Sequence, residues 1–336
     1  TILGEDDFQK GMKLYFDRYD GDAVTIDDFV SSMADANNTN FESFMLWYSQ
    51  AGTPVVSVED EYDENSQTYS ATFTQNNQKT PYTIPNQFGL IDKGGEEVES
   101  GLIIIDELVK TISFKNIKSK PIPSWFRGFS APIKFSSDLS IQNKIYLASF
   151  DTDPFNRWDS AQSLWLEYIL NPEQAIEKDL FQMIKNLFDN ESDYALLSEM
   201  ISLPSEQILH QNVGKIDVQE VHNQRNQSIL SVANAFKDEL LELYYQLNTP
   251  KAFDLSTQSI GERAIKNTCL SYLSKLGEHD IAYQQFINAE CMTDQFGAFQ
   301  CLLDSENRYR AEVITQFYNQ HQSDVQVMDK WFSAQC

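Results

Sequence analysis

Residues 40–62, NFESFMLWYSQAGTPVVSVEDEY, contain the change of pattern that decides the fold. Before Gly52 the large apolar side chains recur every three or four residues, which is the spacing of one face of a helix. After Pro54 the stretch is rich in β-forming residues and alternates, which is the pattern of a strand with one buried face. Glycine commonly ends a helix because it adopts left-handed backbone angles. The sequence therefore predicts helices over residues 1–52 and a β domain from residue 53.

The acidic stretch FDRYDGDAVTIDDF, which begins at Phe16, poses the question of a calcium loop. An EF-hand loop needs oxygen ligands at positions 1, 3 and 5, glycine at position 6 and a bidentate carboxylate at position 12. With Gly21 at position 6, positions 1 and 3 are Phe16 and Arg18, whose side chains cannot bind a cation. We therefore interpret the stretch as a turn, in which Gly21 ends one helix and Thr25 with Asp28 forms a capping box for the next.

Short β-type stretches fill residues 53–152. In QTYSATFTQ the side chains of Tyr69, Ala71 and Phe73 fall on one face, as in a half-buried strand. The stretches TPVVSVEDEY, GLIIIDEL, KTISFKNI, APIKFSS and NKIYLASF are also predicted to be strands, separated by Gly, Pro, Ser and Asn. About six short strands without intervening helices predict an antiparallel β-sandwich.

Helical spacing returns in FNRWDSAQSLWLEYIL, where Trp158 and Trp165 share one stripe, and it continues to the end of the chain. Many helices joined by short polar connections predict a helical superhelix over residues 153–336. No fixed sequence period occurs, so a repeat of the tetratricopeptide type is not supported. Further helices are expected over residues 218–247 and from near Ser256, Thr293 and Ser305.

The composition limits the possible partners. The chain of 336 residues is 41% hydrophobic, so a packed core is expected. It carries 50 acidic against 25 basic residues, and the formal net charge of −25 argues against nucleic acid or an anionic membrane as a partner. No stretch of the sequence approaches the roughly 18 apolar residues that span a bilayer. The chain opens on Thr1 without a basic and apolar leader, so we expect no signal peptide and a cytoplasmic location.

The sequence shows no catalytic or metal-binding constellation. The motifs H-E-x-x-H and G-x-S-x-G and the P-loop are absent. No two histidines lie four residues apart, as a shared site on one helix would need, and no two cysteines form C-x-x-C. We therefore predict no catalytic residue, no metal ligand and reduced thiols. The residues concerned are His210, His222, His279, His321, Cys269, Cys291, Cys301 and Cys336.

Several stretches, spread over the chain, together carry a family resemblance. LGEDDFQKGMKLYFDRYDGDAVTIDDFV is followed by FMLWYSQAGTPVVSV, which contains a W-x-x-Q-x-G-x-P signature. FNRWDSAQSL, FSAPIKF and VMDKWF are the other stretches. They resemble, in unchanged order over nearly the whole chain, zinc aminopeptidases of the aminopeptidase N family, and in particular its bacterial alanyl aminopeptidase branch. The signature residues are Trp47, Gln50, Gly52 and Pro54.

The resemblance implies a multidomain α+β fold. It implies the C-terminal helices of a thermolysin-like catalytic domain over residues 1–52, an antiparallel β-sandwich over residues 53–152, and an incomplete armadillo- or HEAT-like superhelix over residues 153–336. Members of the family release N-terminal amino acids from short peptides, with zinc held by H-E-x-x-H and a distant glutamate, and use a G-x-M-E-N segment and a tyrosine. This chain matches none of these functional elements. We therefore expect a portion of a zinc metallopeptidase that shapes and encloses the active site, carries no zinc ligand and is inactive alone.

Two other interpretations stay open at the level of the sequence. One is a non-catalytic module that binds peptides or proteins through the concave face of its helical array. The weaker alternative is the binding of calcium or carbohydrate by the acidic loop or by the sandwich. If the first helices have lost packing partners, their apolar surface also invites self-association.

Overall fold

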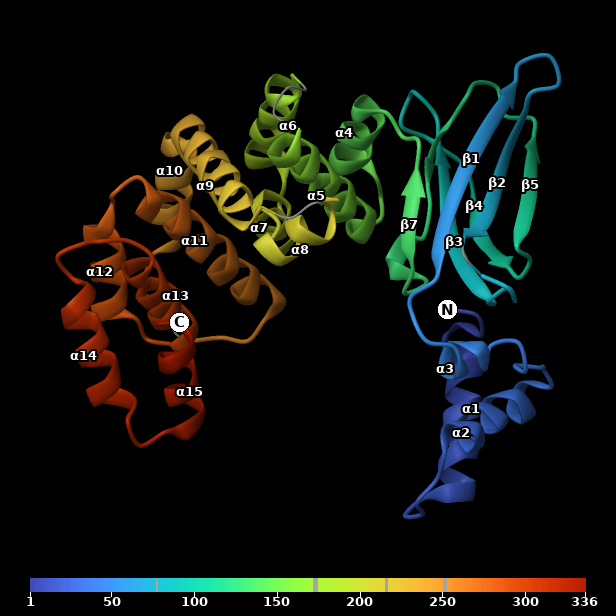
Figure 1. Cartoon of the computed structure of the whole chain (residues 1–336), viewed down its shortest axis with the longest axis horizontal. Coiled ribbons are helices and arrows are strands. Elements are labelled where there is room, and N and C mark those ends of the chain that lie inside the picture. Colours follow the sequence, from blue (N-terminus) through green and yellow to red (C-terminus); the bar gives the residue numbers. More distant parts are fainter. Residues whose placement is uncertain (77, 172–174, 215–216, 250–252) are drawn as a thin grey trace. The chain divides into compact units, whose positions relative to one another are not determined.

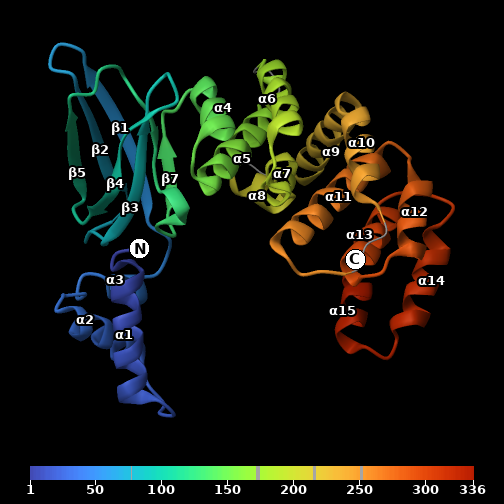
Figure 2. The ribbon, with the colours of Figure 1, turned by 180° about the vertical axis from the view of Figure 1, so that it is seen from behind.

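The computed structural model describes residues 1–76, 78–171, 175–214, 217–249 and 253–336. These residues form two compact units, Thr1–Asn156 and Arg157–Cys336. Figure 1 shows that the strands of the described chain belong to the first unit and that the second unit is helical. Figure 2 shows the same elements from behind.

The first unit opens with three helices. They are α1 (Gly4–Tyr19), α2 (Ile26–Asn37) and the short α3 (Leu46–Ser49). Helices α1 and α2 pack closely because Gly11 has no side chain: a Cβ at this position would lie 2.2 Å from Sδ of Met33.

The turn between α1 and α2 is the capped turn that the sequence predicts. Gly21 has a left-handed φ of 82°. Thr25 Oγ1 accepts a hydrogen bond from Asp28 N at 3.4 Å, and the Asp28 carboxylate accepts one from Thr25 N at 2.8 Å. These two bonds form the capping box, which is thereby confirmed.

The strands form two sheets, with strand orders β5-β2-β1-β7 and β4-β3-β6. Neighbouring strands are antiparallel, except that β1 and β7 pair in parallel. This pair departs from the predicted antiparallel sandwich because the chain reaches β7 from the other sheet and not through a hairpin. The strands are β1 (Val55–Asp63), β2 (Thr68–Asn76), β3 (Ile84–Ile91), β4 (Glu97–Ile105), β5 (Val109–Lys115), β6 (Ile122–Ser124) and β7 (Lys134–Ser137).

Strand β2 contributes its alternate side chains to the core of the sandwich. Tyr69, Ala71 and Phe73 are fully buried, as predicted. The ring of Phe73 meets that of Trp125 edge-on, with centroids 5.0 Å apart. Aromatic side chains of this size dominate the energetics of a core. The sandwich therefore has a hydrophobic core of its own.

The stretch NKIYLASF is part of helix α4 (Ile141–Phe150), so its prediction as a strand is wrong. Ser140 decides the outcome, because its Oγ accepts a hydrogen bond from Asn143 N at 3.2 Å and caps the helix. Leu147 and Ala148 are both buried, which a strand with one exposed face does not allow for neighbouring residues. A short apolar run does not by itself distinguish the two structures.

The loop between β6 and β7 has an unusual backbone. Phe126, Gly128 and Phe129 have left-handed φ angles of 56°, 61° and 51°. This conformation is costly for bulky side chains and persists only where the surroundings enforce it. Here the enforcing contacts come from both sides of the loop, since Phe126 N donates to Asn86 Oδ1 at 2.8 Å and Gly128 N donates to the Asp153 carboxylate at 3.0 Å.

Arg127 anchors the same loop through a buried cluster. Its Nη2 donates to Asp151 at 2.9 Å, and its Nε donates to Ser124 Oγ at 2.9 Å. Nη1 pairs with Glu97, and this partner holds the pKa of the Glu97 carboxyl below its ordinary value. The side chain of Asp151 is fully buried, so Arg127 supplies the opposite charge that a buried carboxylate needs. We call these four residues the Arg127 cluster.

Helix α11 lies at the centre of the second unit, where it contacts α7, α9, α10, α12 and α13. Gly261 lets α11 approach α7, because a Cβ there would lie 2.9 Å from Ala195 N. No helix in the described part of the chain is both long and apolar enough to cross a membrane. The helices are α5 (Pro154–Leu170, which begins in the first unit), α6 (Glu177–Asn190), α7 (Tyr194–Ile201), α8 (Glu206–Gln211), α9 (Val218–Ala235), α10 (Lys237–Leu247), α11 (Thr257–Lys275), α12 (His279–Asn288), α13 (Met292–Leu303), α14 (Arg310–His321) and α15 (Val325–Ser333).

The sequence located some of these helix boundaries and missed others. Helix α11 begins directly after Ser256, as predicted, and Ser256 caps it because its Oγ accepts a hydrogen bond from Ser259 N. The predicted span 218–247 is two helices, since the backbone of Phe236 leaves helical geometry between α9 and α10. The helix expected near Ser305 begins at Arg310.

Candidate functional site

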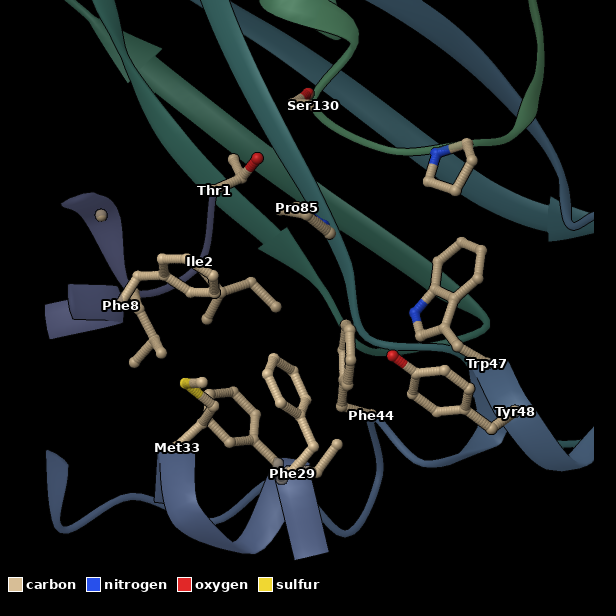
Figure 3. Close-up of a pocket in the computed structure, with 15 residues that line it drawn as sticks. Thr1, Ile2, Phe8, Phe29, Met33, Phe44, Trp47, Tyr48, Pro85 and Ser130 are labelled. Carbon is tan, nitrogen blue, oxygen red and sulfur yellow. The ribbon is translucent and has the colours of Figure 1, made fainter. Parts of the chain in front are cut away.

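An apolar groove of about 410 Å³ lies between helices α1–α3 and the sandwich. Figure 3 shows side chains from several segments around it: Phe8, Phe29 and Met33 from the first two helices, and Phe44, Trp47 and Tyr48 from the third helix and the residues before it. The sandwich adds Pro85, Ser130 and Pro132. We call this feature the apolar groove.

Trp47 fixes one wall of the apolar groove to the sandwich. Its indole Nε1 donates a hydrogen bond to the carbonyl oxygen of Thr83 at 3.0 Å, and its ring lies 4.9 Å from the ring of Tyr82. Ser43 and Thr83 add a hydroxyl–hydroxyl bond of 2.8 Å. Tyr82 is itself buried in the sandwich core, so the position of the indole is set by a rigid element.

The signature W-x-x-Q-x-G-x-P forms the connection between helix and sandwich. The backbone N–H of Gln50 closes the last turn of α3, and Gly52 follows with a φ of 97°. The carbonyl oxygen of Pro54 accepts a hydrogen bond from Lys134 N at 2.9 Å, next to the parallel pairing of β1 with β7. With Trp47 on the groove wall, the signature residues position two elements relative to each other.

The rim of the apolar groove and its surroundings present large apolar side chains to solvent. Phe8 is 41% exposed and Tyr48 is 50% exposed. Phe16 on α1 and Ile26 on α2, which do not line the groove, are 53% and 47% exposed. Exposed apolar residues that gather around a groove mark a contact site, whereas isolated ones need no explanation.

The chemistry available in the apolar groove is limited to contact. The described residues that line it include no carboxylate, imidazole, thiol or cationic side chain. Its side-chain polar atoms are the hydroxyls of Thr1, Tyr48 and Ser130 and the indole nitrogen of Trp47. The Ser130 hydroxyl accepts a hydrogen bond from Gln87 N at 3.1 Å. The groove can therefore bury an apolar partner, and its side chains offer no carboxylate or imidazole pair for acid–base catalysis.

The four histidines named in the sequence lie apart. His222 Nδ1 contacts Glu206 Oε1 at 2.8 Å, whereas His279 Nε2 contacts a serine hydroxyl and His321 Nε2 contacts a glutamine side chain. Burial lowers the pKa of His321. His210, His279 and His321 lie at helix ends.

The residues that the structure describes do not fit a zinc ion. No group of three or more His, Cys, Asp or Glu side chains among them could hold a metal. The four cysteines are free, and burial raises the pKa of both Cys269 and Cys301 to about 12, so these two thiols stay protonated at neutral pH. Cys291 is partly exposed and Cys336 is exposed.

The fold and the groove define the class of protein: helices with an exposed apolar face, followed along the chain by a β-sandwich and then by a helical array. Two family models match the chain. Residues 52–138 match the domain of unknown function DUF3458, described as an Ig-like fold, and residues 141–336 match DUF3458_C, described as ARM repeats. The chain therefore belongs to the DUF3458_C family and has an Ig-like domain followed by ARM repeats.

Curated relatives carry the comparison further. Aminopeptidase N of Escherichia coli (strain K12) is 33% identical over 366 residues, which cover 100% of this chain and 42% of that protein. Aminopeptidase N of Haemophilus influenzae is 31% identical over 361 residues. The aligned region covers 100% of this chain and 41% of that protein. This chain is thus homologous to the C-terminal region of aminopeptidase N, which confirms the resemblance seen in the sequence.

A solved structure agrees with these relatives. The crystal structure of Legionella pneumophila aminopeptidase A in complex with aspartic acid has a TM-score of 0.86 and 26% identity. The match covers 98% of this chain and 42% of the Legionella chain. This chain therefore spans about two fifths of the length of the relatives that it matches.

Proposed function

We propose that this chain is a non-catalytic part of a zinc metalloaminopeptidase that releases N-terminal amino acids from short peptides. The observation that carries the proposal is the match of the whole chain to aminopeptidase N of E. coli at 33% identity. The agreement in fold with an aminopeptidase A supports it. In this proposal residues 1–52 are the last helices of the catalytic domain, residues 53–152 are the sandwich, and residues 153–336 belong to the helical domain.

The role of this part is to shape and enclose the active site. The zinc ligands lie outside the chain in this proposal, because the sequence contains no H-E-x-x-H motif. The apolar groove packs against the rest of the catalytic domain and buries the exposed faces of α1 and α3. The parent enzyme acts in the cytoplasm on short peptides, without nucleic acid or membrane, which agrees with a net charge of −25.

The proposal is tested with the chain alone and with a complementary partner. We expect the chain to hold no stoichiometric zinc by elemental analysis and to leave alanine p-nitroanilide uncleaved. Adding the N-terminal portion of E. coli aminopeptidase N, up to the matched region, is expected to produce more hydrolysis than that portion shows alone. Hydrolysis by this chain that persists through repeated purification would contradict the proposal.

The same proposal includes an association of the chain with itself. In the absence of the rest of the parent, the apolar groove is open to solvent, and contact between two grooves removes apolar surface from water. The net charge of −25 opposes this contact, so salt strengthens the association.

A second candidate function is a non-catalytic peptide-binding module. Two pockets of the second unit that lie against helix α11 have mainly polar linings, which favours this function. A genomic reading frame that extends upstream into an H-E-x-x-H motif would contradict this candidate as an independent function.

A further inference from the structure

Two pockets of the second unit adjoin each other along helix α11. Their volumes are about 380 Å³ and 730 Å³, which is the size range of ligand sites in proteins. Both are lined by Thr268, Ser271 and Lys275 of α11 and by Asp304, which follows α13. The smaller pocket extends to helices α8 and α9, and the larger one extends to α13 and to the residues that end α15. We call the two together the polar trough.

Basic side chains outnumber acidic ones in the polar trough. Arg225, Lys275 and Arg310 line it, against the side-chain carboxylates of Glu206 and Asp304 and the main-chain carboxylate of Cys336, the last residue of the chain. The whole chain shows the opposite balance, with 25 basic and 50 acidic residues. The trough is therefore less acidic than the chain as a whole, and within it the guanidinium of Arg225 is the group that favours a ligand with negative charge.

Both side-chain carboxylates of the polar trough already have partners. Asp304 pairs with Lys275 Nζ at 2.5 Å, and Glu206 contacts His222 Nδ1 at 2.8 Å. Neither carboxylate is thus directed at Arg225. The charge of Arg225 is consequently left for a ligand.

Arg225 is held in place and has donors to spare. Its Nε donates a hydrogen bond to the carbonyl oxygen of Pro204 at 2.7 Å, which fixes the plane of the guanidinium. Among the residues that the structure describes, no acceptor contacts its Nη1 or Nη2. The side chain is partly buried, so water screens its charge only in part. The two Nη groups have the fork geometry that binds a carboxylate through two parallel hydrogen bonds.

The rest of the trough suits an extended peptide. Its lining is rich in serine, threonine, asparagine and glutamine. Several of these side chains already donate within the chain, as Ser271 and Ser274 do to backbone carbonyls, but their oxygens can still accept hydrogen bonds from a peptide backbone. The side-chain amide of Gln300 has no hydrogen-bond partner among the described residues, and Lys275 Nζ has donors beyond its bond to Asp304. A small anion would occupy only the neighbourhood of Arg225, whereas a peptide can use both pockets. Helical arrays commonly present such surfaces to extended chains.

We propose that the polar trough binds an extended peptide that carries a carboxylate, with the Arg225 guanidinium holding the carboxylate and polar side chains of α11 and α13 contacting the backbone. The choice of a peptide rests on the proposed function of the parent enzyme. The requirement for a carboxylate rests on Arg225, whose Nη1 and Nη2 contact no acceptor among the described residues. An acidic side chain and the C-terminus of the peptide offer the same chemistry.

The test uses the full chain and three N-acetylated hexapeptides of alternating alanine and glutamine. The first has a free C-terminal carboxylate, the second has a C-terminal amide, and the third is amidated with one internal glutamate. Titration calorimetry or ligand-observed NMR gives the affinity for each. We expect at least one carboxylate peptide to bind about tenfold more tightly than the neutral peptide, since a charge-assisted bond contributes about that ratio. The peptide that gains affinity identifies the source of the carboxylate.

Variants of Arg225 distinguish a loss of the guanidinium contact from a loss of folding. Arg225→Gln is expected to reduce the affinity of the carboxylate peptide to that of the neutral one, and Arg225→Lys is expected to restore part of the difference. Arg263→Gln is the matched control, because Arg263 also lies in the second unit, on α11, but does not line the trough. Circular dichroism checks that each variant is folded. Equal affinity for all three peptides, or an unchanged affinity in a folded Arg225→Gln protein, would overturn the proposal.

A failure of the trough proposal can be distinguished from a failure of the proposed function. Acetylated peptides have no free amino terminus, so their binding does not depend on aminopeptidase activity. If the chain alone hydrolyses an alanyl substrate, the proposed function fails and the affinity ratio among the peptides is unaffected. If no peptide binds in the millimolar range, the trough proposal fails and the parentage of the chain is untouched.

Discussion

Helices α1–α3 and the β-sandwich belong to one compact unit but are packed very differently. The three helices bury four residues, Gly11, Val30, Ser32 and Met33, and α3 buries none. The sandwich, by contrast, buries aromatic and aliphatic side chains from both sheets, and every second residue of β2 is buried. The sandwich has the core that an independent fold needs, whereas the helices are amphipathic elements that this chain covers only on one side.

The contrast separates a region that still has apolar surface to bury from one that has already buried it. An element whose apolar residues are already buried has little further surface to gain from contact, whereas the exposed rings on α1 and α3 still have apolar area to remove from water. The two regions therefore respond in opposite ways to substitution. Changes in the sandwich are expected to affect stability, and changes in the helices are expected to affect association.

The largest effect is expected in the sandwich core. Phe73→Ala removes a fully buried ring that contacts Trp125, and we expect it to lower the free energy of unfolding by about 4 kcal/mol. Phe16→Ala, in which a ring that is 53% exposed is removed, is expected to change it by about 0.5 kcal/mol or less. Urea titration followed by tryptophan fluorescence measures both. Similar losses in the two variants would remove the distinction between the regions.

The Arg127 cluster gives the next largest effect. Arg127→Met leaves the fully buried Asp151 carboxylate without its cation, and we expect a loss of about 3 kcal/mol in the free energy of unfolding. The double variant Arg127→Met with Asp151→Leu removes both charges and is expected to recover most of this loss. A double-mutant cycle from denaturant melts gives the coupling. Additive losses would mean that the two side chains stabilise the loop independently.

A smaller effect is expected for a substitution in the apolar groove. It is expected to weaken self-association of the chain without changing the stability of the fold. Phe44→Ser is expected to raise the dissociation constant of self-association about tenfold, because an aromatic side chain that lines the groove is removed. The urea midpoint is expected to remain nearly unchanged. Sedimentation velocity over a range of concentrations measures the constant. Tyr318→Ser is the control, since Tyr318 is a 41% exposed aromatic residue in the second unit.

The smallest effect concerns the cap of α2. Hydrogen bonds from the backbone and hydroxyl of Thr25 hold the pKa of the Asp28 carboxyl below its ordinary value. A carboxyl with a lowered folded-state pKa stabilises the fold above its unfolded pKa and loses this contribution as the pH falls through the folded value. We expect the protection factors of the backbone amides in the first turn of α2, measured by hydrogen exchange, to fall in that acidic range. In Thr25→Ala, this loss of protection at low pH is expected to be smaller, because the hydroxyl bond to Asp28 is removed while the bond from the backbone N–H of residue 25 remains.

Local patterns in the sequence were sufficient for some elements. The alternation around Phe73 predicted the buried face of β2, and the spacing of Thr25 and Asp28 predicted the start of α2. Both features depend on neighbours within a few residues. The stretch NKIYLASF was misassigned because its structure depends on a cap at Ser140 and on burial of two adjacent residues, which alternation alone does not report.

Local sequence patterns do not predict the apolar groove, the Arg127 cluster or the polar trough. Arg127 meets residues 24 and 30 positions away, and the groove combines residues 1–48 with Pro85 and Pro132. Chain folding brings such groups together, so no spacing in the sequence encodes them. The parallel partner of β1 is a case of the same kind, because β7 follows it by more than seventy residues. The family resemblance supplied the context that spacing could not.

The indole of Trp47 offers an optical readout of the apolar groove. It lines the groove while its Nε1 is bonded to Thr83 and its ring lies against Tyr82, so its orientation is fixed before any partner arrives. Trp125 and Trp165, in contrast, are almost completely shielded from solvent, and the partly buried Trp158 and Trp331 belong to the second unit and do not line the groove. Filling the groove would displace water from the Trp47 ring and shift its emission to shorter wavelengths. A label-free signal for occupancy is thus built into the residue that joins helix to sandwich.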